Sequence, residues 1–136
     1  LMDLAKAQSQ GLKVHAEIIC YATYAGTPEW FTTAPVFAVK EVLKKANLNV
    51  SDIGLFEINE AFSVVAMASM KELVIPREKI NIRGGAVALG HPIGCSGARI
   101  LITLLSCMKE RKVSFGCASL CIGGGEAVAM VLKRTS

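Results

Sequence analysis

Strand-like and helical segments alternate along this chain, and this alternation constrains the fold more than any other feature of the sequence. Apolar, β-branched runs are typical of buried strands, whereas apolar residues that recur every three or four positions are typical of helices. Strands are predicted over residues 14–22, 53–58, 80–82, 114–121 and 127–132, and helices over residues 35–46, 61–70 and 98–108. The order βαβαβαββ predicts an α/β domain with a mixed five-stranded sheet and helices on both of its faces.

Two of the predicted helices are apolar around their whole circumference. Residues 61–70 read AFSVVAMASM, and residues 98–108 read ARILITLLSCM. A helix without a polar face must be covered on several sides. Because 136 residues rarely supply enough mass to bury two such helices completely, we expect a partner to cover one face. Self-association through the apolar helix Ile100–Met108 is one form that this contact could take.

The composition narrows the class of protein. With 136 residues and 52% hydrophobic composition, the chain has the size of one globular domain. A net charge of +4 without a long basic run, together with 6% aromatic residues, argues against a nucleic-acid partner. The longest uncharged apolar runs fall far short of the roughly 20 residues that span a bilayer, so no membrane segment is predicted. Residues 1–10 are expected to form a connector and residues 11–136 the domain.

The cysteine content indicates a reducing compartment. The five cysteines are odd in number and contain no CxxC pair, which argues against a disulfide framework and against a zinc ribbon. We therefore expect a cytoplasmic protein, with an organelle left open if an upstream targeting segment was lost. The chain begins with Leu1 where an initiator methionine would stand, so we expect a processed product or a piece of a longer protein.

The stretch Gly84–Gly97 reads GGAVALGHPIGCSG and places a histidine directly before a proline. Proline pushes the residue before it out of the α region, so His91 is predicted to lie on a loop. His91 and Cys95 are four residues apart, as metal ligands on a helix would be, but Pro92 and Gly94 disfavour helical geometry between them. No metal site is predicted. Taken alone, the stretch is equally consistent with an ordinary glycine-rich turn.

Three polar side chains, those of Asn59, His91 and Cys121, each follow a predicted strand. Loops at strand ends are where open α/β sheets place their sites, so the three groups can converge. A thiol acts as a base only as thiolate, and backbone amides of the glycine turn after Cys121 could lower its pKa. The alternative is a buried structural cysteine. Neither a P-loop nor a dinucleotide-binding fingerprint is present.

Three signatures connect the chain with a known family: NEAF at Asn59–Phe62, GGAVALGHPIGCSG at Gly84–Gly97 and CIGGG at Cys121–Gly125. With these signatures in the family's order, residues 11–134 resemble the C-terminal domain of a thiolase of the acetyl-CoA acetyltransferase type. The resemblance implies a thiolase-like domain that takes part in Claisen condensation or in thiolysis of acetoacetyl-CoA.

The resemblance also implies a role for each matched position. His91 would favour the thiolate of a nucleophilic cysteine and help to hold the thioester oxygen, and Asn59 would order a water that joins it in an oxyanion hole. Cys121 would be the acid/base that moves the α-proton of acetyl-CoA. The amide of Gly123 would complete the oxyanion hole of the acyl-enzyme, and Phe62 would wall the substrate pocket.

The nucleophilic cysteine of the family belongs to the N-terminal half, and no segment here matches it. The resemblance therefore implies a catalytic C-terminal half that is inactive alone, with an N-terminal thiolase domain as partner. Acetyl-CoA and acetoacetyl-CoA would be substrates, and no tightly bound cofactor is expected. The alternative is a stand-alone thiolase-like half that acts as a non-catalytic binding or assembly module. A related decarboxylating enzyme would be expected to have histidine at position 121.

Overall fold

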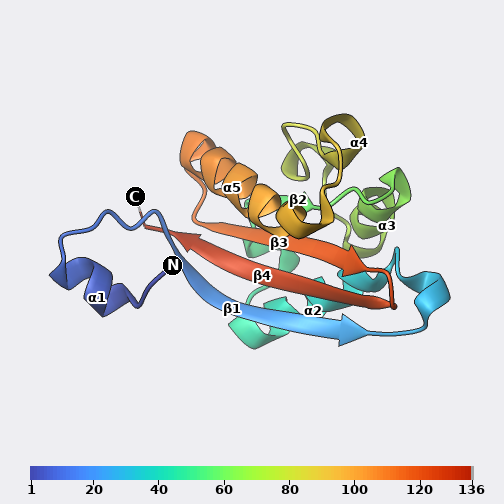
Figure 1. The fold of residues 1–136 in the computed structure, drawn as a ribbon, viewed down its shortest axis with the longest axis horizontal. Helices are drawn as coiled ribbons and strands as arrows, with labels where there is room; N and C mark the ends of the chain where they lie inside the picture. Colours follow the sequence, from blue (N-terminus) through green and yellow to red (C-terminus); the bar gives the residue numbers. More distant parts are fainter. Residues whose placement is uncertain (136) are drawn as a thin grey trace.

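A mixed sheet lies at the centre of the protein and has four strands within residues 1–135, the part of the chain that the computed structural model describes (Figure 1). The strands are β1 (Ala16–Ala25), β2 (Leu55–Ile58), β3 (Phe115–Ile122) and β4 (Glu126–Arg134). They lie side by side in the order β1-β4-β3-β2. β4 pairs antiparallel with both β1 and β3, whereas β2 pairs parallel with β3.

Helices cover both faces of this sheet, as the alternation of segments predicts. On one face lie α2 (Ala34–Ala46) and α3 (Ser63–Leu73), and on the other lies α5 (Ile93–Arg111) (Figure 1). Two short helices, α1 (Leu4–Ser9) and α4 (Ala86–Leu89), lie outside these layers, and 3₁₀ turns cover Pro28–Trp30, Val50–Asp52 and Arg77–Lys79. No helix within residues 1–135 combines the length and the apolar character needed to cross a bilayer.

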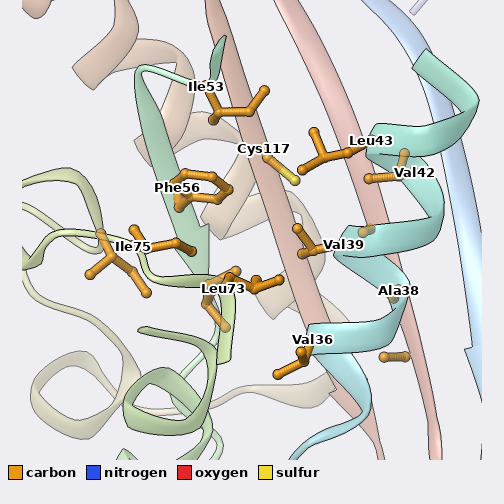
Figure 2. Close-up of a cluster of buried hydrophobic side chains, with 14 of the residues drawn as sticks. Val36, Ala38, Val39, Val42, Leu43, Ile53, Phe56, Leu73, Ile75 and Cys117 are labelled. Atoms are coloured by element: carbon orange, nitrogen blue, oxygen red, sulfur yellow. The ribbon is translucent and has the colours of Figure 1, made fainter. Parts of the chain in front are cut away.

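The larger core lies between α2, α3 and the sheet. Its α2 side chains recur at helical spacing and are each at most 4% exposed: Val36, Val39, Val42 and Leu43. Figure 2 shows Val36, Val39 and Leu43 on the side of α2 that faces Cys117 of β3, and Phe56 of β2 belongs to the same core. Proline in the first turn suits the start of α2, and Asn47 ends the helix in the left-handed conformation.

The second core lies under α5. Here Ile100, Leu104, Cys107 and Met108 are buried against the sheet, while Ile102 on the outer side of the helix is 67% exposed. The chain's own sheet therefore covers one face of Ile100–Met108. Nothing in residues 1–135 supports pairing of two copies through this helix.

The apolar helix α3 is covered on one side only. Val65, Ser69 and Leu73 are buried, but Val64 and Met67 are 48% and 64% exposed. Residues 1–135 thus leave one side of this apolar helix open, and the expectation that a partner covers such a face stays a prediction.

The strand predicted over residues 80–82 is wrong, and the sheet has four strands instead of five. Ile80 makes a single bridge to Phe56. The next residue, Asn81, adopts a left-handed conformation with φ 45°, which ends extended pairing. Its side chain then replaces a strand, because Oδ1 accepts from the Ile58 N–H and Nδ2 donates to the Ile58 carbonyl, both at 2.8 Å.

Helix α5 begins earlier than predicted. His91 lies on a loop as expected, but Gly94–Gly97 is helical because α5 starts at Ile93, directly after Pro92. The first N–H groups of a helix have no intrahelical acceptor, so a proline at this boundary removes no hydrogen bond. The Pro92 carbonyl accepts from the Ser96 N–H at 2.9 Å and opens the helical ladder.

Replacement of Leu104 by alanine tests which face of α5 belongs to the core. We expect Leu104→Ala to lower the free energy of unfolding by about 2–5 kcal/mol, because it opens a cavity under the helix. The matched variant Ile102→Ala, on the exposed side, is expected to change it by less than about 0.5 kcal/mol. Urea denaturation measures both. Equal costs would contradict the assignment of the buried face.

Candidate active site

Asn59 and Cys121 lie at the same end of the sheet, where the parallel strands β2 and β3 finish. β2 and β3 are parallel neighbours, and the Asn59 N–H donates to the Ser119 carbonyl at 2.9 Å just beyond the last paired residue of β2. Cys121 stands two residues further along β3. Because the carboxyl ends of parallel strands lie at the same end of a sheet, Asn59, just after β2, and Cys121, near the end of β3, lie in one region.

The alternation of side chains along β2 decides which face each residue serves. Phe56 and Ile58 belong to the core beneath α2, whereas Leu55 packs with α5. With period two, Glu57 and Asn59 share the α5 face with Leu55. Both polar side chains are buried, with exposed fractions of 1% and 0%.

His91 reaches Asn59 from a loop that Glu60 holds in place. One carboxylate oxygen of Glu60 accepts from the Asn81 amide and the other from the Val87 N–H, each at 3.1 Å. Gly85 packs so closely on this carboxylate that a Cβ there would lie 2.5 Å from the Glu60 Cδ. His91 follows the short helix α4, not a strand as predicted.

The His91 ring lies between Asn59 and Ser96. The Asn59 amide nitrogen is 3.4 Å from both ring nitrogens, and the buried Ser96 hydroxyl is 2.6 Å from Nδ1. The Ser96 hydroxyl also lies 3.2 Å from the Pro92 carbonyl, and its single proton can go either to that carbonyl or to Nδ1. When the hydroxyl donates to the carbonyl, it accepts from Nδ1–H, and the lone pair of the ring is then on Nε2.

Behind Asn59 lie Arg99 and Glu57. The Arg99 Nη2 donates to the Asn59 Oδ1 at 3.2 Å, and Nη1 is 3.9 Å from the Glu57 Oε2. Burial raises the pKa of Glu57 from its ordinary value of 4.5 to about 7, and the positive charge of Arg99 opposes this rise.

Cys121 is buried and belongs to the core on the α2 side of the sheet. Burial raises the pKa of its thiol, and its own backbone N–H opposes this rise to a smaller extent. Burial therefore favours the protonated thiol, and the backbone N–H favours the thiolate to a smaller extent. Within residues 1–135, Asn59 and His91 are in contact, whereas no hydrogen bond joins Cys121 to either of them.

Gly123 and Phe62 are accessible residues next to these groups. Gly123 lies in the exposed turn between β3 and β4, where a Cβ would meet no atom within 4 Å. Phe62 is 58% exposed, and its ring meets Phe31 edge to face with centroids 6.1 Å apart. Among residues 1–135, no three His, Cys, Asp or Glu side chains form a group that could hold a metal ion.

Comparison with known protein families identifies the chain. Residues 12–134 match the family model described as thiolase, C-terminal domain. The chain belongs to the thiolase family. It is 52% identical to acetyl-CoA acetyltransferase 1 of Arabidopsis thaliana over 136 residues, which are 100% of this chain and 33% of that protein.

Solved structures resemble this thiolase domain over nearly its whole length. The acetyl-CoA acetyltransferase of Bacillus anthracis superposes with a TM-score of 0.95 at 41% identity, covering 98% of this chain and 34% of that one. Acat5 thiolase from Ascaris suum, solved in complex with coenzyme A, superposes with a TM-score of 0.92 at 45% identity and the same coverage. The chain thus spans about a third of the length of the relatives that it matches.

Sequence reasoning missed Ser96, Arg99 and Glu57 as parts of the thiolase site. A signal was present for two of them, because Glu57 is the only charged residue in the strand segment 53–58 and Arg99 the only one in the apolar segment 93–108. Two lone charges of opposite sign in buried segments predict that the segments meet at those positions. No comparable signal marks Ser96.

The Ser96→Ala variant tests the tautomer in which Ser96 accepts from Nδ1–H. Without the hydroxyl, Nδ1–H loses its acceptor, and we expect the ring nitrogen chemical shifts of His91 to move from the Nδ1–H tautomer toward a mixture of both. Long-range ¹H–¹⁵N spectra measure this, and His15, the one other histidine, is the internal control. A wild-type tautomer in Ser96→Ala would contradict this role of Ser96.

The raised pKa of Glu57 predicts a dependence of stability on pH. The folded chain keeps the Glu57 proton up to about pH 7, whereas the unfolded chain releases it near pH 4.5. The stability from this proton is complete below about pH 4.5 and is lost as the pH rises to about 7, a loss of about 3 kcal/mol.

Urea denaturation between pH 4.5 and 7.5 measures this loss. The Glu57→Gln variant is expected to lack this part of the slope, and Glu29→Gln, at an exposed position, is expected to keep it. An unchanged slope in Glu57→Gln would show that another group titrates in this range.

Proposed function

We propose that this thiolase domain is the C-terminal catalytic part of an acetyl-CoA C-acetyltransferase that acts on acetyl-CoA and acetoacetyl-CoA. The observation that carries the proposal is the contact between Asn59 and His91 at the end of the sheet where Cys121 also lies. The named activity of the Arabidopsis and Bacillus relatives supports the substrate class, and the coenzyme A complex of the Ascaris relative supports a thioester.

His91 and Asn59 would act on the thioester oxygen. Removing the proton next to a thioester creates an enolate, and donors placed in advance around its oxygen are usually the largest catalytic contribution. The Asn59 amide, fixed on a buried strand end, would order a water that joins His91 in this oxyanion hole. With the ring proton on Nδ1, the Nε2 of His91 can accept the proton of a nucleophilic thiol and then, as N–H, donate to an oxyanion.

Cys121 would move the α-proton. In thiolysis, its protonated thiol delivers the proton to the enolate carbon of the departing acetyl-CoA, and the raised pKa favours this protonated form. In condensation, the thiolate takes the proton from the acetyl carbon and the electron pair passes into the enolate. That carbon then attacks the carbonyl of the acyl-enzyme, the C–S bond breaks, and the nucleophilic cysteine leaves as thiolate. The amide of Gly123 would hold the acyl oxygen, and Phe62 would wall the pocket.

The nucleophile would come from a partner domain, the N-terminal part that the relatives' length implies. Cys20 donates to the Val42 carbonyl, and Cys107 and Cys117 lie in the two cores, so these three thiols are engaged elsewhere.

A row of exposed apolar side chains beside the site is proposed as the surface that the N-terminal domain covers: Val87, Leu89, Ile93 and Ile122. The alternative of a non-catalytic module has no observation in its favour. The absence of a tightly bound cofactor and a cytoplasmic location stay predictions.

A fusion enzyme tests the proposal. The matching third of the Arabidopsis acetyltransferase is replaced by this chain, and exchange of the acetyl α-protons with deuterium is followed by NMR. We expect Cys121→Ala to slow exchange by about 10²- to 10⁴-fold while acylation of the nucleophile persists, because only the base is lost.

The matched control is Cys20→Ala, which removes a thiol from β1, on the other side of the sheet from β2, and is expected to exchange at the wild-type rate. Wild-type exchange in Cys121→Ala would remove that residue from the base role. A folded fusion with the native chain that fails to cleave acetoacetyl-CoA would overturn the proposed function itself.

A further inference from the structure

Two opposite charges meet between β2 and α5, directly behind the Asn59 amide. Glu57 lies two residues before Asn59 on the same face of β2, and Arg99 is on the face of α5 that carries Ser96, three residues earlier. Arg99 lies against both residues, because Nη2 donates to the Asn59 Oδ1 at 3.2 Å and Nη1 is 3.9 Å from the Glu57 Oε2.

The chemistry of the guanidinium decides how the Asn59 amide is turned. Arginine has donors and no acceptor, so the atom of Asn59 that it contacts must be the carbonyl oxygen. The opposite end of the amide, its NH₂ group, then faces the His91 ring at 3.4 Å. If the amide turned over, its oxygen would face the ring, and the donor that Asn59 offers beside His91 would be lost.

Glu57 offsets only part of the charge of Arg99, because its pKa of about 7 leaves it partly protonated at neutral pH, and the two groups are too far apart for a hydrogen bond. The Glu57 Oε1 and the Arg99 Nε and Nη1 are buried and have no hydrogen-bond partner within residues 1–135. The pair therefore stabilises the fold little, and replacing both charges by neutral side chains of similar size is compatible with folding. A pair with this geometry that contributes little to the fold calls for another role.

We propose that Arg99, supported by Glu57, is the positioning residue that holds the Asn59 amide with its NH₂ group toward His91. The inference deepens the proposed acetyl-transfer function and rests on it for its catalytic consequence. The orientation of Asn59, however, is a property of this chain and can be measured without turnover.

The first experiment uses this chain alone. In the native protein, we expect a nuclear Overhauser effect between the Asn59 side-chain NH₂ and the His91 ring protons. Arg99→Met is expected to lose this signal, and Arg111→Met, at an exposed position of the same helix, is expected to keep it. Because Arg99→Met leaves Glu57 unpaired and could unfold the chain, the double variant Glu57→Gln/Arg99→Met is measured as well. It removes both charges, and we expect it to fold and still to lack the signal.

The second experiment uses the fusion enzyme and separates positioning from stability. We expect the double variant to lower kcat by about 10- to 100-fold with KM within about twofold, because the donor at the oxyanion is disordered while substrate binding is kept. Arg99→Lys keeps the charge beside Glu57 and one donor, so it is expected to restore part of kcat. Arg111→Met is expected to match the native fusion.

The outcomes distinguish the two proposals. Retention of the Asn59–His91 signal in the double variant, or a folded double variant with native kcat, overturns the positioning role of Arg99. Loss of the signal together with an inactive native fusion leaves Arg99 as the residue that orients Asn59 and overturns only the proposed function.

Discussion

The parallel ladder between β2 and β3 carries the chain into the site, because its hydrogen bonds continue beyond the last residue of β2 to the Asn59 N–H and the Ser119 carbonyl. Because helices cover both faces of β2, any shift of its register places side chains on the wrong face. Shifting β2 by one residue would exchange the buried Phe56 and Glu57 and turn the amide of Asn59 away from α5. The apolar cores that hold this register therefore also determine which polar groups meet.

The site joins supports of different rigidity. Asn59 stands on a buried strand end, and Ser96 and Arg99 stand on a 19-residue helix, whereas His91 stands on a loop. The loop is restrained by the Glu60 carboxylate at one end and by the Ser96 hydroxyl at the ring. Side chains on regular elements are held more firmly than those on loops. The histidine is thus the one group whose position depends on side-chain hydrogen bonds more than on the sheet.

Sequence patterns predicted the parts of this protein that backbone periodicity controls. β-branched runs located the strands, and apolar spacing located α2, since one buried face is enough to produce each pattern. The patterns failed where a side chain takes the place of backbone pairing and where a helix begins. The Asn81 amide makes hydrogen bonds that a fifth strand would have made. Pro92 was expected to disfavour a helix at Gly94, but α5 begins directly after it. Motifs marked Asn59 and His91, but the contacts of Ser96 and Arg99 with them follow from tertiary packing, which no local pattern reports.

The two edges of the sheet differ in their capacity for intermolecular strand addition. At the β2 edge, the Asn81 side chain occupies both backbone groups of Ile58, and its own N–H donates to the Phe56 carbonyl. An incoming strand finds those groups already taken. The opposite edge is the ten-residue β1, with exposed Ile18 and Tyr21 and, within residues 1–135, no strand on its outer side. The Asn81 amide, which helps to anchor the site loop, thus also blocks the addition of a foreign strand at β2. The edge that remains open to intermolecular pairing is β1.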